Sequence, residues 1–180
     1  MLSTIFKKKL SDNQLANVFI NGILELVENS FSEVVGMVND DVAFPENPNI
    51  EVSNNGHFSL IVLAANLSNL ESTFETDQAD RVERIIFDKL AVMMNCSSEQ
   101  AMEEIRDLQK FMGRINHPSK NLIYAMSKAF FFKYDLNQYQ DEYFRRLSTP
   151  NPLFLKRLDA IMPEYLWDWD NFFRRYKIEE

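Results

Sequence analysis

The segment Ser11–Val38 constrains the fold more than any other part of the chain, because its apolar residues recur at steps of three and four. Ser11 and Gln14 have the S-x-x-Q form of a capping box, which satisfies free backbone N–H groups at a helix start. One stripe then follows: Leu15, Val18, Phe19, Gly22, Ile23, Leu26, Val27, Phe31, Val34, Val35 and Val38. The stripe predicts one amphipathic helix of about seven turns, in which Gly22 permits a close helix crossing.

Residues 39–56 are predicted to form a loop, since two prolines interrupt any helix and an Asn-Asn-Gly turn signal stands at 54–56. Two structures fit the sequence around this turn. One is a short β-hairpin near residues 50–62. The other is a helix over about 57–72, which we favour because apolar residues continue almost all round it. Such a pattern is typical of a buried central helix.

The rest of the chain predicts further helices. Ser97–Gln100 is a second capping-box pattern, and Pro118 and Pro152 suit the first turn of a helix. The expected ranges are 77–94, 97–115, 118–134, 137–148, 151–162 and 163–177. We therefore expect an all-α fold: a compact, irregular bundle of six to eight helices. Residues 1–180 are expected to form a single helical domain, with 1–10 as a flexible N-terminus.

Charge is distributed unevenly along the chain. The net charge is −8, from 19 Lys and Arg against 27 Asp and Glu. No Lys or Arg occurs between Lys9 and Arg81, whereas twelve acidic residues do: Asp12, Glu25, Glu28, Glu33, Asp40, Asp41, Glu46, Glu51, Glu71, Glu75, Asp77 and Asp80. Aromatic residues show the opposite trend, with 16 of the 23 in residues 111–180. An acidic half and an aromatic half are therefore expected.

Several kinds of site are excluded by composition. The single cysteine, Cys96, excludes a disulfide scaffold and a cysteine-based zinc site. No glycine pair has the G-x-G form of a phosphate-binding loop. Neither His57 nor His117 belongs to the Glu-x-x-His pattern of di-iron bundles. We therefore predict no catalytic residue, metal or cofactor.

The start of the chain and its hydropathy bear on location. Its basic cluster follows a very short apolar stretch, which is the reverse of a secretory signal. No apolar run approaches the length of about 18 residues that a membrane span needs. With only one thiol, a cytoplasmic location is expected.

The C-terminal region predicts an aromatic and basic surface. In a helix over 163–177, Leu166, Trp169 and Phe173 would form one stripe, with Trp167 on the opposite side. One of the two Trp side chains would then pack in the core, and the other would be available at the surface. Trp and Arg are favoured interface residues. The candidate surface comprises Trp167, Trp169, Phe172, Arg174 and Arg175. Acidic residues among the basic pairs argue against nucleic-acid binding.

These observations favour a non-enzymatic protein–protein interaction module, such as an adaptor, a chaperone or an immunity-like protein. Its acidic surface over residues 10–80 would bind a basic partner. The candidate acidic face comprises Glu25, Glu28, Glu33, Asp40 and Asp41. One alternative is a helical pocket that binds a small apolar ligand. Another is a carboxylate- and Mg²⁺-dependent enzyme, which requires several acids to converge in one cleft.

Overall fold

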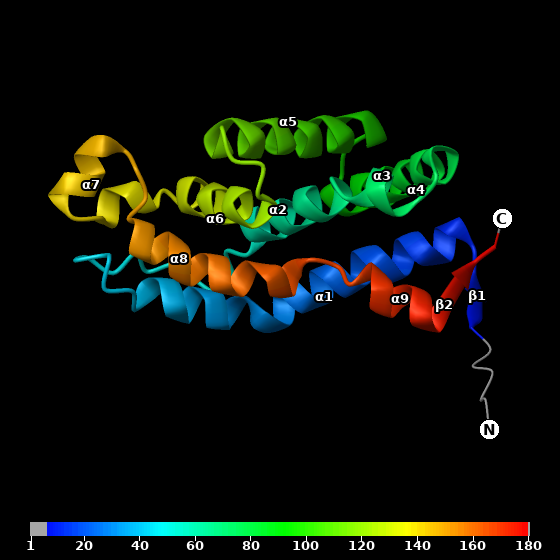
Figure 1. The fold of residues 1–180 in the computed structure, drawn as a ribbon, viewed down its shortest axis with the longest axis horizontal. Helices are drawn as coiled ribbons and strands as arrows, with labels where there is room; N and C mark the ends of the chain where they lie inside the picture. Colours follow the sequence, from blue (N-terminus) through cyan, green and yellow to red (C-terminus); the bar gives the residue numbers. More distant parts are fainter. Residues whose placement is uncertain (1–6, 180) are drawn as a thin grey trace, which may run out of the picture.

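The computed structural model describes residues 7–179. Helix α1 (Asp12–Asn39) runs along most of the molecule (Figure 1). The predicted capping box begins it: the Gln14 backbone N–H donates to Ser11 Oγ at 3.3 Å, and the Ser11 N–H donates to Gln14 Oε1 at 3.0 Å. The predicted stripe faces the core, where ten residues of α1 are buried. The apolar periodicity and the capping box therefore predicted this helix correctly.

The segment after the loop forms helix α2 (Gly56–Leu67), followed by the single turn α3 (Leu70–Thr73). The hairpin alternative near residues 50–62 is wrong. Eight of the twelve residues of α2 are buried, including every residue from Ile61 to Leu67. Because α2 contacts α1 and two later helices, apolar side chains all round it are buried, which a half-exposed hairpin could not achieve.

Three longer helices follow: α4 (Thr76–Met94), α5 (Ser98–Asn116) and α6 (Leu122–Lys133). Helices α5 and α6 pack on α2, whereas α4 packs on α1 and α5. The predicted ranges for α4 and α5 are confirmed to within two residues. Helix α6 begins later than expected. Its N-cap is Asn121, whose side chain accepts backbone N–H groups of the first turn, so Pro118 lies in the preceding loop.

The C-terminal third is divided into shorter helices than predicted. It contains two 3₁₀ turns and three α-helices, in the order η1 (Leu136–Tyr139), α7 (Glu142–Leu147), α8 (Pro152–Ile161), η2 (Met162–Tyr165) and α9 (Trp169–Arg175). The expected continuous helix over 163–177 is therefore wrong. The side chain of Asp168 accepts the Asn171 backbone N–H at 2.8 Å, so α9 begins only at Trp169.

Two short strands bring the ends of the described chain together. Strand β1 (Lys8–Leu10) pairs in parallel with β2 (Tyr176–Ile178). The Glu179 N–H continues the pairing by donating to the Leu10 carbonyl at 2.9 Å. Neither strand was predicted, and β1 occupies part of the segment expected to be flexible. Residues 1–6 of that segment lie outside the described residues.

The helices form three layers (Figure 1). Helix α5 lies on one side, α2, α4 and α6 lie in the middle, and α1, α8 and α9 form the third layer. The buried apolar residues form one contiguous cluster. Seven α-helices of the described chain have seven or more residues, which confirms the predicted all-α bundle. Within residues 7–179, no helix is long and apolar enough to cross a membrane.

Candidate functional site

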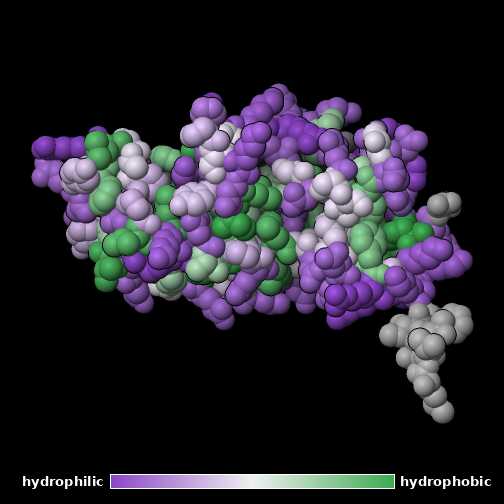
Figure 2. All heavy atoms as spheres, in the orientation of Figure 1, coloured by the Kyte–Doolittle hydropathy of each residue, from purple (hydrophilic) through white to green (hydrophobic). Residues whose placement is uncertain are grey.

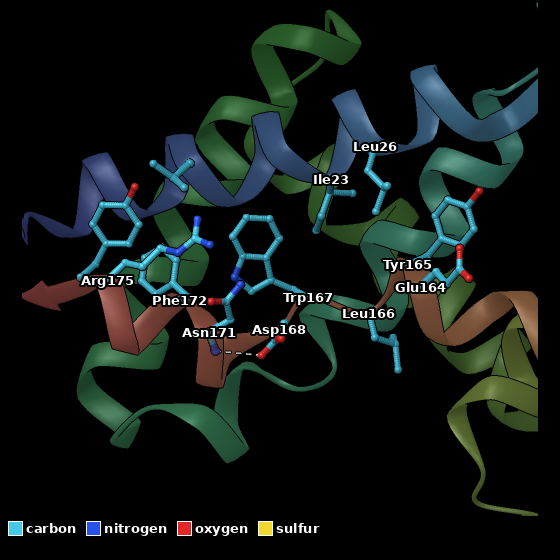
Figure 3. A pocket seen from close by; sticks show the side chains of 12 residues that line it. Ile23, Leu26, Glu164, Tyr165, Leu166, Trp167, Asp168, Asn171, Phe172 and Arg175 are labelled. Carbon is cyan, nitrogen blue, oxygen red and sulfur yellow. Dashed lines mark hydrogen bonds between the residues drawn. The ribbon is translucent and has the colours of Figure 1, made fainter.

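An open cleft of about 340 Å³ lies between α1 and the segment Glu164–Tyr176 (Figure 3). Helix α1 supplies three apolar residues, and the remaining lining residues come from η2, α9, the segment between them and the first residue of β2. The lining is Val18, Ile23, Leu26, Glu164, Tyr165, Leu166, Trp167, Asp168, Asn171, Phe172, Arg175 and Tyr176. The cleft thus contains three of the five residues predicted for the C-terminal surface: Trp167, Phe172 and Arg175.

Trp167 forms the centre of the cleft because Gly22 gives it room. A Cβ atom at residue 22 would lie only 2.6 Å from Cζ3 and 2.8 Å from Cη2 of the indole. The space at Gly22 is therefore filled by one side chain, and not by the close helix crossing that the sequence predicted. Trp167 precedes the helix, so the expectation that it lies opposite Trp169 on a helical wheel is wrong. Both are half-buried and contact Phe19.

The buried side chain of Asn66 on α2 holds the wall of the cleft in place. Its Nδ2 donates to the Tyr165 carbonyl at 2.8 Å, and its Oδ1 accepts the Trp167 N–H at 2.7 Å. Nδ2 also donates to Val62 O within α2, so both amide hydrogens are used. The sequence analysis did not identify Asn66. It could have been found as the one asparagine among the eleven other, mostly apolar residues of α2, because a polar side chain in a buried helix needs hydrogen-bond partners.

Tyr165 connects this wall to α1. Its hydroxyl lies 2.7 Å from Ser30 Oγ, and Ser30 itself donates to the Leu26 carbonyl at 2.6 Å, so the phenol is the donor. Burial is the main cause that raises the pKa of Tyr165, and the negative charges of Glu164 and Glu33 raise it further. Both carboxylates therefore act on the same phenol, although they come from different ends of the sequence.

Charge is divided along the cleft. Figure 3 shows Arg175 beside Phe172 at one end and Glu164 beside Tyr165 at the other, with Trp167 between them. Asp168, which caps α9, also lines the cleft. Among the ion pairs of the described residues, none involves Glu33, Glu164, Asp168 or Arg175. The acidic end of the cleft thus has no basic side chain to neutralise it.

The candidate acidic residues of α1 do not all share one face. Successive helical residues turn by about 100°, so Glu33 falls within about 20° of the cleft residue Leu26. Glu25 lies about 100° away and Glu28 about 160° away by the same geometry. All three are exposed. Glu33 therefore projects from the same side of α1 as Leu26, beyond the residues that line the cleft, whereas Glu25 and Glu28 form a ridge on the solvent side of α1.

Asp40 and Asp41 end α1 at the far side of the molecule. Asp40 is the exposed C-cap residue. Asp41 is not part of an acidic face, because its side chain is only 2% exposed and accepts two hydrogen bonds from Arg157, at 2.6 Å and 2.5 Å. These hydrogen bonds raise the pKa of the Arg157 guanidinium. The charge of Asp41 is therefore neutralised by Arg157 in an ion pair, and it is not available to a partner protein.

The twelve acids between residues 10 and 80 do not form one patch. Helix α1 alone spans about 40 Å, at 1.5 Å per residue for 28 residues. The acids from Glu71 to Asp80 lie on α3 and the start of α4, which Figure 1 places near the N-terminal end of α1. Exposed charges separated by more than about 8 Å are largely screened at physiological salt. The acidic residues therefore act in local groups.

Comparison with known proteins finds no matching family model, no matching curated protein and no matching solved structure.

Arg174, Trp169 and Phe172 complete the predicted aromatic and basic surface. Arg174 is exposed but does not line the cleft, while Phe172 is 5% exposed and packs inward. Trp169 stacks between Phe19 and Phe173, with ring centroids 5.5 Å and 5.8 Å away. No group of three or more His, Cys, Asp or Glu side chains within residues 7–179 is placed to hold a metal ion. The geometry instead provides an apolar cleft with an acidic end.

Proposed function

We propose that the protein is a non-enzymatic protein-interaction module, and that its cleft binds an apolar, basic segment of a partner. One observation supports this most strongly. The negative charges of Glu33 and Glu164 both act on the phenol of Tyr165, which lines an open apolar cleft, and the described residues supply no ion-pair partner to either carboxylate. A partner that brings a Lys or Arg side chain to this end would supply the missing charge.

The apolar wall would contribute most of the affinity of such a complex. Leu26 is 38% exposed, and Leu166 and Trp167 are half-buried, so each has surface left to cover. Burying such surface contributes about 25 cal/mol per Å². The carboxylates would mainly set the association rate and reject acidic competitors. Affinity and specificity therefore arise from different residues of the same cleft.

The exposed ridge of α1 suits long-range attraction rather than contact. Glu25 and Glu28 are both exposed and have no ion-pair partner within the described part of the chain. Their charges would raise the local concentration of a basic partner beside the cleft. A cytoplasmic location is part of this proposal, since Cys96 is a free thiol.

A small apolar ligand is the second candidate occupant. The cleft volume is near the lower end of the range for ligand pockets, roughly 300–1,000 Å³. In addition, Trp167 Nε1 is buried without a hydrogen-bond partner, which leaves one donor in the wall. The unpaired carboxylates favour the basic partner, because a neutral apolar ligand would leave them unused.

Selection of short random peptides displayed on phage, against the full chain at low salt, tests the proposal. The enriched peptides should carry Lys or Arg together with aliphatic or aromatic residues. They should bind the variant Glu33→Gln/Glu164→Gln weakly. They should bind the control Glu103→Gln/Glu104→Gln, on α5, as well as the unmodified chain. Enrichment of neutral or acidic peptides, or equal binding to both variants, would refute the proposal.

A further inference from the structure

Helix α7 is unusual because none of its six residues is buried. Hydrogen bonds between polar groups, rather than packing in the core, hold this helix in place. Gln140, at its base, is 3% exposed. The Gln140 side chain donates to the Thr149 carbonyl at 2.9 Å and accepts the Asn151 N–H at 2.7 Å. These two bonds close residues 141–149 into a protruding loop, which we call the α7 protrusion.

Large apolar side chains cover the α7 protrusion and its flank. Tyr143 is 67% exposed and Leu147 is 55% exposed, while Leu153, in the first turn of α8, is 64% exposed. Figure 2 shows hydrophobic residues gathered at this end of the molecule, where Figure 1 places α7. Exposed apolar groups on a polar, preformed support are typical of a binding surface.

The α7 protrusion also presents unpaired positive charge. Its two acids are already engaged, since Asp141 caps the Phe144 N–H and Glu142 pairs with Arg146. Arg145 is exposed, and so is Lys156 on α8. Among the ion pairs within residues 7–179, neither has a partner. The protrusion thus combines apolar side chains with a free cation, the chemistry that we assign to the partner of the cleft.

We propose that the α7 protrusion of one copy of this chain docks into the cleft of a second copy. This inference rests on the proposed function of the cleft and names its occupant. Arg145 would approach Glu33 and Glu164, and Tyr143 or Leu147 would cover Leu26 and Trp167. A copy cannot fill its own cleft, because α7 and α9 lie at opposite ends of the molecule (Figure 1). The contact is therefore head-to-tail, which builds chains or rings of copies.

Sedimentation velocity of the full chain, at increasing concentration and low salt, gives the first readout. The unmodified chain should assemble, and high salt should dissociate it. Two variants should each remain monomeric: Arg145→Glu/Leu147→Ser, which changes only the protrusion, and Glu33→Lys/Glu164→Lys, which changes only the cleft. Each should weaken self-association at least about tenfold. All four residues are exposed, so both variants should fold. Lys120→Glu, in a loop away from both surfaces, is the control.

Mixing the two variants is the decisive step. An equimolar mixture contains one intact protrusion and one intact cleft per pair, so it should form a heterodimer and stop there. A mixture that stays monomeric, or an unmodified chain that stays monomeric at every concentration, would overturn the inference. Binding of the unmodified chain to phosphatidylserine vesicles through Tyr143 and Leu147, without self-association, would also overturn it. If the basic peptides still bound the cleft, the proposed function would stand and only its occupant would be wrong.

Discussion

Gly22 on α1 and Trp167 before α9 are in direct contact, with space for a hydrogen but not for a methyl group between them. The contact joins two parts of the chain 145 residues apart and forms the inner wall of the cleft. It gives the cleft a rigid aromatic wall, because the indole packs against two residues of α1: Gly22 and Phe19, whose ring centroid lies 5.6 Å from that of the indole.

Substitution of Gly22 tests this contact. Gly22→Ala should lower the free energy of unfolding by about 1–2 kcal/mol, because overpacking outweighs the gain in helix propensity. Gly36→Ala on the same helix is the matched control. Nothing lies within 4 Å of the added methyl group there, so that variant should gain up to about 1 kcal/mol. Urea denaturation measures both, and equal stability of the two variants would show that Trp167 does not pack against Gly22.

Asn66→Ala should both destabilise the protein and weaken the cleft. It removes the bonds to the Tyr165 carbonyl and the Trp167 N–H, whose loss in the interior costs about 1–3 kcal/mol. Urea denaturation gives the stability, and Trp fluorescence reports the shared environment of Trp167 and Trp169. Asn17→Ala, on the exposed side of α1, is the control. An unchanged indole spectrum in Asn66→Ala would contradict the positioning role.

Asp41 should matter for stability, whereas its exposed neighbour Asp40 should not. Asp41→Asn should cost about 1–3 kcal/mol, because it weakens the hydrogen bonds from Arg157. The loss stays below that for a fully buried pair, since the Arg157 side chain is 40% exposed. Asp40→Asn should change stability by less than about 0.5 kcal/mol. Urea denaturation compares the two, and similar losses would argue against a special role for the ion pair.

Tyr134 makes stability depend on alkaline pH. Its hydroxyl donates to the Asn54 carbonyl at 2.7 Å and accepts the Phe58 N–H at 3.2 Å. Burial raises the pKa of Tyr134 to about 12, against 10.0 in an exposed tyrosine. Between these pH values the unfolded chain releases the proton and the folded chain keeps it. Stability present below pH 10 is therefore lost progressively toward pH 12, by roughly 2–3 kcal/mol.

Tyr134→Phe separates this effect from other alkaline effects. The variant should be less stable at neutral pH, by about 1–3 kcal/mol, because the Phe58 N–H and the Asn54 carbonyl lose their partner. Its stability should then fall less steeply than that of the unmodified chain above pH 10. Urea denaturation across this pH range measures both slopes, and parallel slopes would contradict the assignment to Tyr134.

Local signals in the sequence predict the long helices. The capping boxes at Ser11 and Ser97 and the apolar stripes are interactions within one helix, so they require no knowledge of the fold. Helix α2 is recognisable for a related reason, since its apolar residues have no polar side to expose. These elements settle the all-α class of the fold.

The cleft could not be predicted in the same way, because each contact that makes it joins distant residues. Asn66 and Tyr165 are 99 residues apart. Arg157, which neutralises Asp41, lies 116 residues after it. Trp167 was misplaced because Asp168 caps α9 and leaves the indole on an extended segment, where helical spacing no longer applies. Periodicity identifies which residues belong to one face, but not which faces meet.

The central claim is that Glu33 and Glu164 form an acidic end of the cleft that binds a cation of the partner. The most direct test is the dissociation constant of one selected basic peptide for three chains, measured at low salt by the fluorescence of Trp167 and Trp169. Glu33→Gln/Glu164→Gln should weaken binding at least about tenfold. Glu103→Gln/Glu104→Gln removes the same charge on α5, away from the cleft, and should change the dissociation constant less than about threefold. Equal weakening by the two variants would mean that net charge alone attracts the peptide, and would contradict the account.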